Sequence, residues 1–319
     1  MATADQVKSL VKAYVDRDDD KFKTVVLQIA AHEAKLGHAE IARDLKQLMD
    51  KVGTKQAGII KFNAQNPMLL CSVPSVELSE LIVAEDITMK IRKILSEYRN
   101  RKKLYSYGLS NRRKILIEGK PGTGKTMTAS VIASEIGVPL YTVQVDKLVT
   151  KFMGETSARL RQIFDNMEMQ PGVYLFDEFD AIGADRSLDN EVGEMRRILN
   201  SFLQFIEQDT SDSIIIAATN NQKILDQALF RRFDDVLHYE MPTEKEIERL
   251  IKSKLDAYER SVKIRKTLID EAIGLSQAEI AKSCDDAIKT AILDDCEITE
   301  KMLISLFQER RNIYASKEA

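Results

Sequence analysis

Hydrophobic and polar residues follow two different periodic patterns along this chain. In the first fifty residues, apolar positions recur every three or four residues, as at Val7, Leu10 and Val11, and two later stretches of that region repeat the spacing. Such spacing places the apolar side chains on one face of a helix. The pattern predicts three amphipathic helices, which together form a small N-terminal helical domain at residues 1–50.

The periodicity is lost between Lys51 and about Leu78, where Pro67 and Pro74 occur. Proline interrupts regular structure and favours extended backbone in the residue before it. We therefore predict a linker or an extended segment at residues 51–77.

Beyond this segment, short apolar runs alternate with stretches of helical spacing. The first helix is expected from about Asp86 to Leu104. The runs that suit buried strands are Lys114–Glu118, Leu140–Val145, Val173–Phe176 and Ser213–Ala218. Strands that alternate with helices form βαβ units. Residues 78–241 are therefore predicted to fold as an α/β domain, with a mainly parallel sheet that helices cover on both faces.

The strand pattern stops before Thr243. Thr243 and Glu246 have the spacing of a capping box, in which each side chain hydrogen-bonds to the backbone N–H of the other residue at the start of a helix. Helical periodicity then continues to the C-terminus. Residues 242–319 are predicted to form an all-helical lid on the α/β domain.

Composition restricts the kinds of protein that this chain can be. Hydrophobic residues make up 44% and charged residues 30%, as in soluble globular proteins. Lys and Arg total 47 against 50 Asp and Glu, a net charge of -3, so no overall basic field favours nucleic acid as a partner. No apolar run approaches the roughly 20 residues that span a bilayer, so no membrane partner is expected. The three cysteines lack metal-site spacing, and we expect a cytoplasmic protein.

The most specific motif follows the first predicted strand. Residues 119–126 read Gly-Lys-Pro-Gly-Thr-Gly-Lys-Thr, which fits the phosphate-binding pattern G-x-x-x-x-G-K-[ST] between a strand and a helix. Glycines let the backbone N–H groups turn toward phosphates, because a Cβ would clash or forbid the required φ. Lys125 is expected to reach the β- and γ-phosphates of ATP, and Thr126 to ligate Mg²⁺. The candidate nucleotide-binding residues are Gly119, Pro121, Gly122, Thr123, Gly124, Lys125, Thr126 and Met127.

A second apolar run, Val173–Phe176, ends abruptly in Asp177 and Glu178. In an open parallel sheet, ligands bind at the carboxyl ends of the strands, which places these acids beside the phosphate loop. Asp177 is then a ligand of Mg²⁺, and Glu178 is the general base that activates the attacking water. The alternative is an acidic strand end that only begins a solvated loop.

Polar residues also follow the last apolar run, at residues 213–218. Asn220 comes directly after it, and its amide can hydrogen-bond the attacking water or the γ-phosphate. Farther along, Arg231 and Arg232 are adjacent. Two adjacent arginines beside a strand are most often a surface salt-bridge cluster, but their place after a candidate catalytic strand keeps a role at the nucleotide open.

Four segments occur in an order that resembles a known family. GKPGTGKT, LFDE, ATNN and LDQALFRRFDD are similar to the Walker A, Walker B, sensor 1 and second-region-of-homology motifs of AAA ATPases, over roughly Leu78 to the C-terminus. The RRF form is similar to that of the spastin and katanin group. The resemblance implies a P-loop NTPase fold, ATP and Mg²⁺ as ligands, and a homo-oligomeric ring, expected to be a hexamer. It also implies that Arg231 and Arg232 are arginine fingers that reach the nucleotide of a neighbouring subunit.

The resemblance implies two further sites. Lys151, Phe152 and Met153 are similar to the aromatic pore loop that grips a threaded polypeptide, and residues 184–191 align with a second pore loop. Ile82 and Val83 lie where the backbone of family members contacts adenine, and Val83 is the candidate binding residue.

The basic run Arg99–Lys103 has two interpretations. It can form a local nucleic-acid patch, but a charged run near a helix end is usually a solvated face that complements the helix dipole. We favour the solvated face.

These features predict a ring motor that hydrolyses ATP to ADP and phosphate and that remodels, unfolds or threads protein substrates. Two alternatives stay open: a DNA-directed motor or loader, and an ATP-gated scaffold that does little processive work. Phe152 favours a polypeptide motor over a DNA motor. The N-terminal domain is expected to select partners, since a helical bundle offers a groove to another helix. The layout is also similar to compact bacterial AAA proteins that work beside a separately encoded subtilisin-like protease.

Overall fold

The structure is a computed structural model of the chain. It describes residues 25–26, 29–30, 43, 66–148, 155–179, 191–220, 230–256, 258 and 262–315. The chain divides into two compact units, Met1–Asn63 and Ala64–Ala319. In the first unit, Val25, Val26, Ile29 and Ala30 are helical and buried, as expected for the apolar face of an amphipathic helix. The rest of the predicted three-helix pattern lies outside the described residues.

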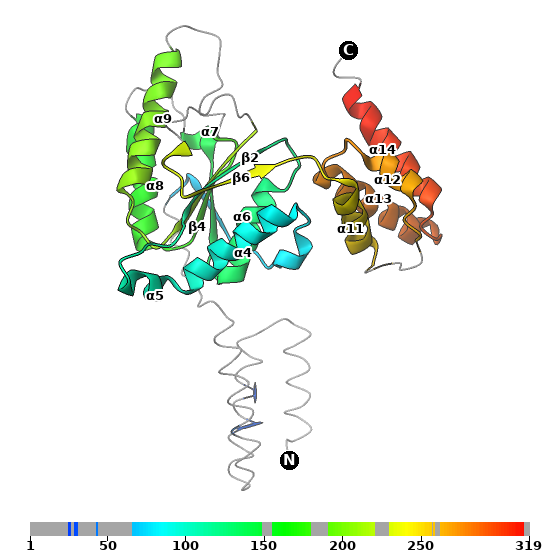
Figure 1. Ribbon diagram of the computed structural model, residues 1–319, viewed down its shortest axis with the longest axis horizontal. Coiled ribbons are helices and arrows are strands. Elements are labelled where there is room, and N and C mark those ends of the chain that lie inside the picture. The colour runs from blue at the N-terminus through cyan, green and yellow to red at the C-terminus, as the bar shows by residue number, and fades with distance from the viewer. Residues whose placement is uncertain are drawn as a thin grey trace. The chain divides into compact units, whose positions relative to one another are not determined.

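A six-stranded sheet organises the second unit (Figure 1). The strands run in the order β1-β3-β4-β5-β2-β6, and every neighbouring pair is parallel except β1 with β3. Their bounds are β1 Leu69–Ser72, β2 Lys114–Gly119, β3 Leu140–Val143, β4 Val173–Phe176, β5 Ile214–Thr219 and β6 Asp235–Tyr239. The mainly parallel sheet and the helices between its strands confirm the predicted α/β class.

The two strands that the apolar pattern did not predict are the two edges of this sheet. β1 lies within the segment 51–77, where it pairs Leu69 with Val143 of β3, so this part of the segment is extended structure. β6 pairs with β2 at the other edge. An edge strand is partly exposed to solvent, so it needs no continuous apolar run. β6 accordingly contains Asp235 and His238 among its five residues.

Helices cover both faces of the sheet (Figure 1). The covering helices are α4 Glu85–Arg99 and α6 Lys125–Ile136 on one face, and α8 Glu155–Met169 and α9 Glu191–Gln208 on the other. Successive side chains of a strand point to opposite faces. On β4, Val173 and Leu175 therefore join the core under α4 and α6, whereas Tyr174 and Phe176 join the core under α8 and α9. Short elements between these are η1 Leu78–Glu80, α5 Arg101–Ser106 and α7 Val145–Leu148.

The helix predicted from Asp86 to Leu104 is wrong in one respect, because it is interrupted at Asn100. α4 ends at Arg99, and α5 begins at Arg101. Asn100 Nδ2 donates to Ser96 O at 2.8 Å. Asparagine side chains compete in this way with the regular backbone hydrogen bonds of a helix, and they favour helix ends.

The C-terminal helices form a separate bundle, which we call the lid. They are α11 Glu244–Leu255, α12 Lys266–Ala272, α13 Gln277–Asp294 and α14 Glu300–Ala315. The lid has its own core, which includes Ile247, Cys284 and Phe307. α11 begins at the predicted capping box, in which Thr243 N donates to Glu246 Oε2 at 2.8 Å. Among the residues after Thr243 that the structure describes, every regular element is a helix, as predicted. Among the described residues, no helix has both the length and the apolar character needed to cross a membrane.

Candidate functional site

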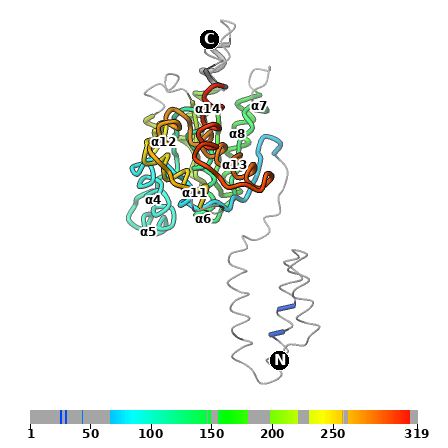
Figure 2. Tube along the Cα trace, turned by 90° about the vertical axis from the view of Figure 1, so that its right-hand side faces the viewer, coloured from blue at the N-terminus to red at the C-terminus, as the bar shows by residue number. Residues whose placement is uncertain are grey.

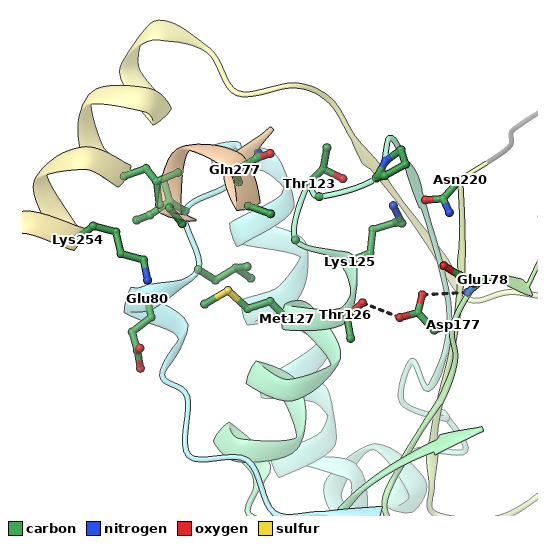
Figure 3. A pocket seen from close by; sticks show the side chains of 18 residues that line it. Glu80, Thr123, Lys125, Thr126, Met127, Asp177, Glu178, Asn220, Lys254 and Gln277 are labelled. Atoms are coloured by element: carbon green, nitrogen blue, oxygen red, sulfur yellow. Dashed lines mark hydrogen bonds between the residues drawn. The ribbon is translucent and has the colours of Figure 1, made fainter. Parts of the chain in front are cut away.

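The loop between β2 and α6 borders a cavity of about 410 Å³ (Figure 3). The cavity wall comes from this loop, from η1 and the residues after it, from the ends of β4 and β5, and from lid helices α11 and α13. β4, β5 and β2 are neighbouring parallel strands. Their carboxyl ends therefore bring segments that are distant in the sequence to one edge of the sheet.

All but one of the predicted nucleotide-binding residues in the loop line this cavity, namely Pro121, Gly122, Thr123, Gly124, Lys125, Thr126 and Met127. Gly119 lies behind the loop, against β6. A Cβ on Gly119 would come within 2.4 Å of Tyr239 O, so no other residue fits there. Tyr239 is buried, and its hydroxyl is hydrogen-bonded to Thr128 Oγ1 of α6. Burial raises the pKa of Tyr239, so the neutral phenol holds α6 against β6.

The lid contacts the phosphate loop at Gly122. Ala278 N, in the first turn of α13, donates to Gly122 O at 2.9 Å. A Cβ on Gly122 would lie 2.5 Å from Oγ of Ser276, the N-cap residue of α13. Gly122 also has a φ of 77°, which L-residues with a Cβ rarely adopt. Backbone conformation and the proximity of the lid thus both require glycine at this position.

The charges around the loop suit an anion. Lys125 is buried, and its Nζ donates to Gly119 O and Lys120 O, each at 2.8 Å. α6 begins at Lys125 and α13 at Gln277, so two helix N-termini meet at the cavity, each with a partial positive charge. Lys254 of α11 adds a second lysine to the wall. A phosphate group is the type of ligand that such an arrangement stabilises.

Thr126 and Asp177 form a pair of oxygen ligands. Thr126 Oγ1 donates to Asp177 Oδ2 at 2.6 Å, so the start of α6 is tied to the end of β4 (Figure 3). Mg²⁺ in nucleotide sites is usually held by one or two carboxylates together with phosphate oxygens and waters. A hydroxyl and a carboxylate in contact beside an anion site therefore fit Mg²⁺, and Thr126 and Asp177 are the residues that would hold it.

Glu178 occupies a strained turn at the end of β4. Its φ is 50°, in the left-handed region that costs a residue with a Cβ roughly 1 to 3 kcal/mol. Asp177 Oδ1 accepts from Glu178 N at 2.9 Å and stabilises the turn. Glu178 is exposed, and it lines the cavity with Asn220, which follows β5. The turn thus directs two consecutive acidic residues into the cavity, and the end of β5 adds an amide to the same wall.

The other predicted site residues lie outside this cavity. Arg231 is exposed, and Arg232 Nε lies 2.7 Å from Glu207 Oε1 of α9, so neither arginine lines the cavity of its own chain. Val83 is buried in the core beneath α6, and the cavity wall beside it is formed by Glu80, Leu81 and Ile82. Lys151, Phe152, Met153 and residues 184–190 lie outside the described residues.

Sequence reasoning missed the lid side of the cavity, which consists of Leu250, Lys254, Gln277, Ala278 and Ala281. One local signal was available for α13, because Ser276 and Glu279 have capping-box spacing and do form that box. No sequence pattern marks Leu250 or Lys254. Their place at the cavity depends on how α11 packs against α13, which is a long-range contact.

Comparison with known proteins identifies relatives of this chain. The family model described as "ATPase family associated with various cellular activities (AAA)" matches residues 115–241. An uncharacterized AAA family ATPase, y4kL, from Sinorhizobium fredii is 33% identical over 311 residues. That similarity covers 92% of this chain and 91% of the relative.

More distant relatives share only part of their length with this chain. A putative 26S proteasome regulatory subunit homolog from Methanothermobacter thermautotrophicus is 26% identical over 70% of this chain and 60% of its own length. ATP-dependent zinc metalloprotease FtsH 4 from Sphaerobacter thermophilus is 30% identical, and the match covers 72% of this chain but 36% of FtsH 4. The crystal structure of the FIGL-1 AAA domain has a TM-score of 0.61 at 19% identity, covering 82% of this chain and 95% of that one. The structural similarity supports the fold.

We predict that Gly122→Ala weakens ATP binding at least about tenfold, because the new Cβ meets Ser276 of the lid as well as straining the backbone. Gly137→Ala is the matched control. Gly137 has a φ of 71° but nothing within 4 Å of its Cβ, so its substitution carries only the backbone cost, about 1 to 2 kcal/mol of folding stability. Calorimetric titration with ATP measures both affinities. Equal affinities in the two variants would show that the lid contact plays no part in binding.

Proposed function

Because this chain belongs to the AAA family of ATPases, we propose that it assembles into a ring, with six subunits expected, in which ATP hydrolysis drives remodelling, unfolding or threading of protein substrates. ATP hydrolysis is the general activity of the family. One observation carries the proposal for the site: Thr126 Oγ1 contacts Asp177 Oδ2 at 2.6 Å, beside the buried Lys125. This contact joins the phosphate-binding loop to the acidic strand end within one chain.

Apart from a finger supplied by a neighbouring subunit, the residues around the cavity offer the groups that phosphoryl transfer to water uses. Lys125 and the loop N–H groups offset the negative charge of the β- and γ-phosphates. Thr126 and Asp177 would hold Mg²⁺, which when bound would neutralise charge on the phosphate oxygens. Glu178 accepts a proton from the water that attacks the γ-phosphorus, while the bond from that phosphorus to the ADP oxygen breaks. Asn220 orients the water.

The contact between the loop and the lid supports a mechanical use of this reaction. Ala278 N is hydrogen-bonded to Gly122 O, and α13 carries Ile280 and Cys284 of the lid core. A change at the phosphates therefore acts on the start of an 18-residue helix around which the lid is packed. The lid rotates with α13, and this rotation changes the contact between neighbouring subunits.

The surroundings of the two arginines suggest different roles. Arg231 is exposed and lies away from the cavity of its own chain, so its guanidinium is available to a neighbouring subunit. Arg232 is half-buried, and its Nε is 2.7 Å from Glu207 Oε1. We assign Arg231 as the finger that acts on the neighbouring nucleotide, and Arg232 as the residue that positions this segment on α9.

Protein is the substrate class that the relatives support. Two of them are named as a proteasome regulatory subunit homolog and as FtsH, an ATP-dependent protease. Because this chain covers 36% of FtsH 4, the zinc protease activity in that name is not assigned to it. The net charge of -3 gives a DNA-directed motor no support. A separately encoded protease is a further partner that a ring of this kind can serve.

Glu178→Gln is expected to bind ATP and Mg²⁺ but to hydrolyse ATP at least about tenfold more slowly, because the amide keeps the shape and cannot accept the proton. Glu168→Gln is the control, since Glu168 is exposed on α8 and is not part of the cavity wall. It should hydrolyse at the wild-type rate. Phosphate release and nucleotide binding are measured on both variants. A wild-type rate from Glu178→Gln would exclude Glu178 as the base.

Arg231→Ala should lose hydrolysis and keep ATP binding, whereas Lys125→Ala should lose binding. An equal mixture of the two variants should regain part of the activity, because one supplies an intact loop and the other an intact finger. The control mixture combines Arg231→Ala with the double variant Lys125→Ala/Arg231→Ala. No subunit in this mixture has an intact finger, so no nucleotide site is complete. If the first mixture is as inactive as the control, the action of Arg231 across subunits is disproved.

Phe152→Ala should leave ATP hydrolysis within a few-fold of wild type and abolish unfolding of a tagged protein, because an aromatic ring grips any side chain through its large apolar face. Phe152→Tyr is the matched variant, and it should retain most of the unfolding because the ring is kept. Loss of the native signal of the substrate is followed together with ATP turnover. Unfolding at the wild-type rate by Phe152→Ala would favour the scaffold alternative.

A further inference from the structure

A buried carboxylate lies directly before the phosphate loop. Glu118 of β2 precedes Gly119, and its side chain is 3% exposed. His238 Nδ1 on edge strand β6 is hydrogen-bonded to Glu118 Oε1. A buried charge is costly unless an opposite charge and hydrogen bonds compensate for it. Neither residue lines the cavity, so any effect of the pair on the site passes through its neighbours in the sheet.

The pair belongs to a row of three residues that crosses the carboxyl ends of three strands. Glu118 pairs in register with Thr219 of β5 on one side and with His238 of β6 on the other. Leu116, two residues earlier on β2, belongs to the core under α8 and α9, so Glu118 points to the same face. α8 and α4 lie on opposite sides of the sheet (Figure 1; Figure 2), and the row is on the side of α8.

Each member of this row is followed directly by a residue that shapes the site. Thr219 precedes Asn220 of the cavity wall, and Glu118 precedes Gly119, at which the phosphate loop begins. The member on β6 precedes Tyr239, whose hydroxyl is hydrogen-bonded to α6. A displacement between these three strand ends would therefore move the loop, the amide and the helix relative to one another.

We propose that Glu118 and His238 are positioning residues for ATP hydrolysis. With the imidazole protonated, His238 supplies the positive charge that the buried carboxylate requires, and the ion pair fixes the carboxyl end of β2 against β6. The start of the phosphate loop is thereby fixed relative to Asn220. The orientation of an attacking water is sensitive to such placement, since a displacement of about 1 Å can cost up to about a hundredfold in rate. The inference rests on the proposed function of the cavity and adds to it residues that do not touch the nucleotide.

His238→Ala removes the partner of the carboxylate and opens no core, because the His238 side chain is 58% exposed. We expect kcat to fall at least about tenfold and KM for ATP to stay within about threefold of wild type. Lys125 and several loop N–H groups bind the phosphates together, so binding depends less on a single distance than the orientation of a water does. Both constants are measured at a protein concentration at which the rate per subunit no longer rises. If His238→Ala does not fold, His238→Gln, whose side chain is closer in size, carries the same expectation.

Two further variants distinguish an ion pair from a side chain that only fills space. His238→Lys keeps a cation beside Glu118 and should retain most of the wild-type kcat. Glu118→Gln/His238→Ala loses the buried charge together with its partner. Its loss in kcat should be smaller than the product of the losses from Glu118→Gln and His238→Ala measured singly, because the effects of two residues in direct contact are not additive.

Asp235→Asn is the matched control on the same strand. Asp235 forms ion pairs with Lys90 and Arg112 at the amino end of β6, with distances of 3.3 and 3.4 Å. Its replacement should lower the melting temperature and leave kcat at the wild-type value, since this end of the strand does not line the cavity.

Four results would disprove the positioning role. They are a loss of kcat in His238→Ala no larger than in Asp235→Asn, a rise in KM that matches the loss of kcat, a His238→Lys variant as slow as His238→Ala, and single losses that multiply in the double variant. If wild type itself hydrolyses no ATP, the proposed function of the cavity is disproved and the positioning role with it. A fault in the inference alone leaves wild-type hydrolysis intact, so the two failures are distinct.

Discussion

The phosphate loop depends on two close approaches that only glycine permits. On one side, the backbone of Tyr239 in edge strand β6 presses against Gly119, and on the other, Ser276 of the lid presses against Gly122. The loop is therefore held between the sheet and the lid. Tyr239 also hydrogen-bonds to α6, so strand, loop and helix share one buried anchor. A side chain at either glycine would separate the loop from the elements that give it its shape.

The acidic side of the site depends on the order of the strands. Asp177 and Asn220 are far apart in the sequence. Because β4 and β5 are parallel neighbours, both residues lie at the same edge of the sheet. The core side chains on both faces of β4 make this placement rigid, with Tyr174 and Phe176 buried on one face. The strain at Glu178 is sustained by that packing and by the bond from its N–H to Asp177. A carboxylate that follows a rigid strand and a strained turn has a more fixed orientation than one on a flexible loop.

A single subunit has surfaces that its own fold does not use. Arg231 is exposed and does not line the cavity of its own chain, and the ends of α5 and α13 expose apolar residues. In the proposed ring, a rotation of α13 that begins at Gly122 would act on the neighbouring subunit, so hydrolysis in one cavity would affect the geometry of another.

The sequence by itself determined the α/β class, the loop at 119–126, the acids after Val173–Phe176 and the capping box at Thr243, because each depends on spacing within a few residues. It did not reveal the edge strands β1 and β6, since apolar periodicity is weak in strands that are partly exposed to solvent. Nor did it reveal the break at Asn100, which depends on a hydrogen bond from that side chain to Ser96 O. Only the tertiary structure decided that Lys254 and Ala278 close the cavity and that Gly122 meets Ser276. Such contacts join residues far apart along the chain, so they follow from how the lid packs and not from any local pattern.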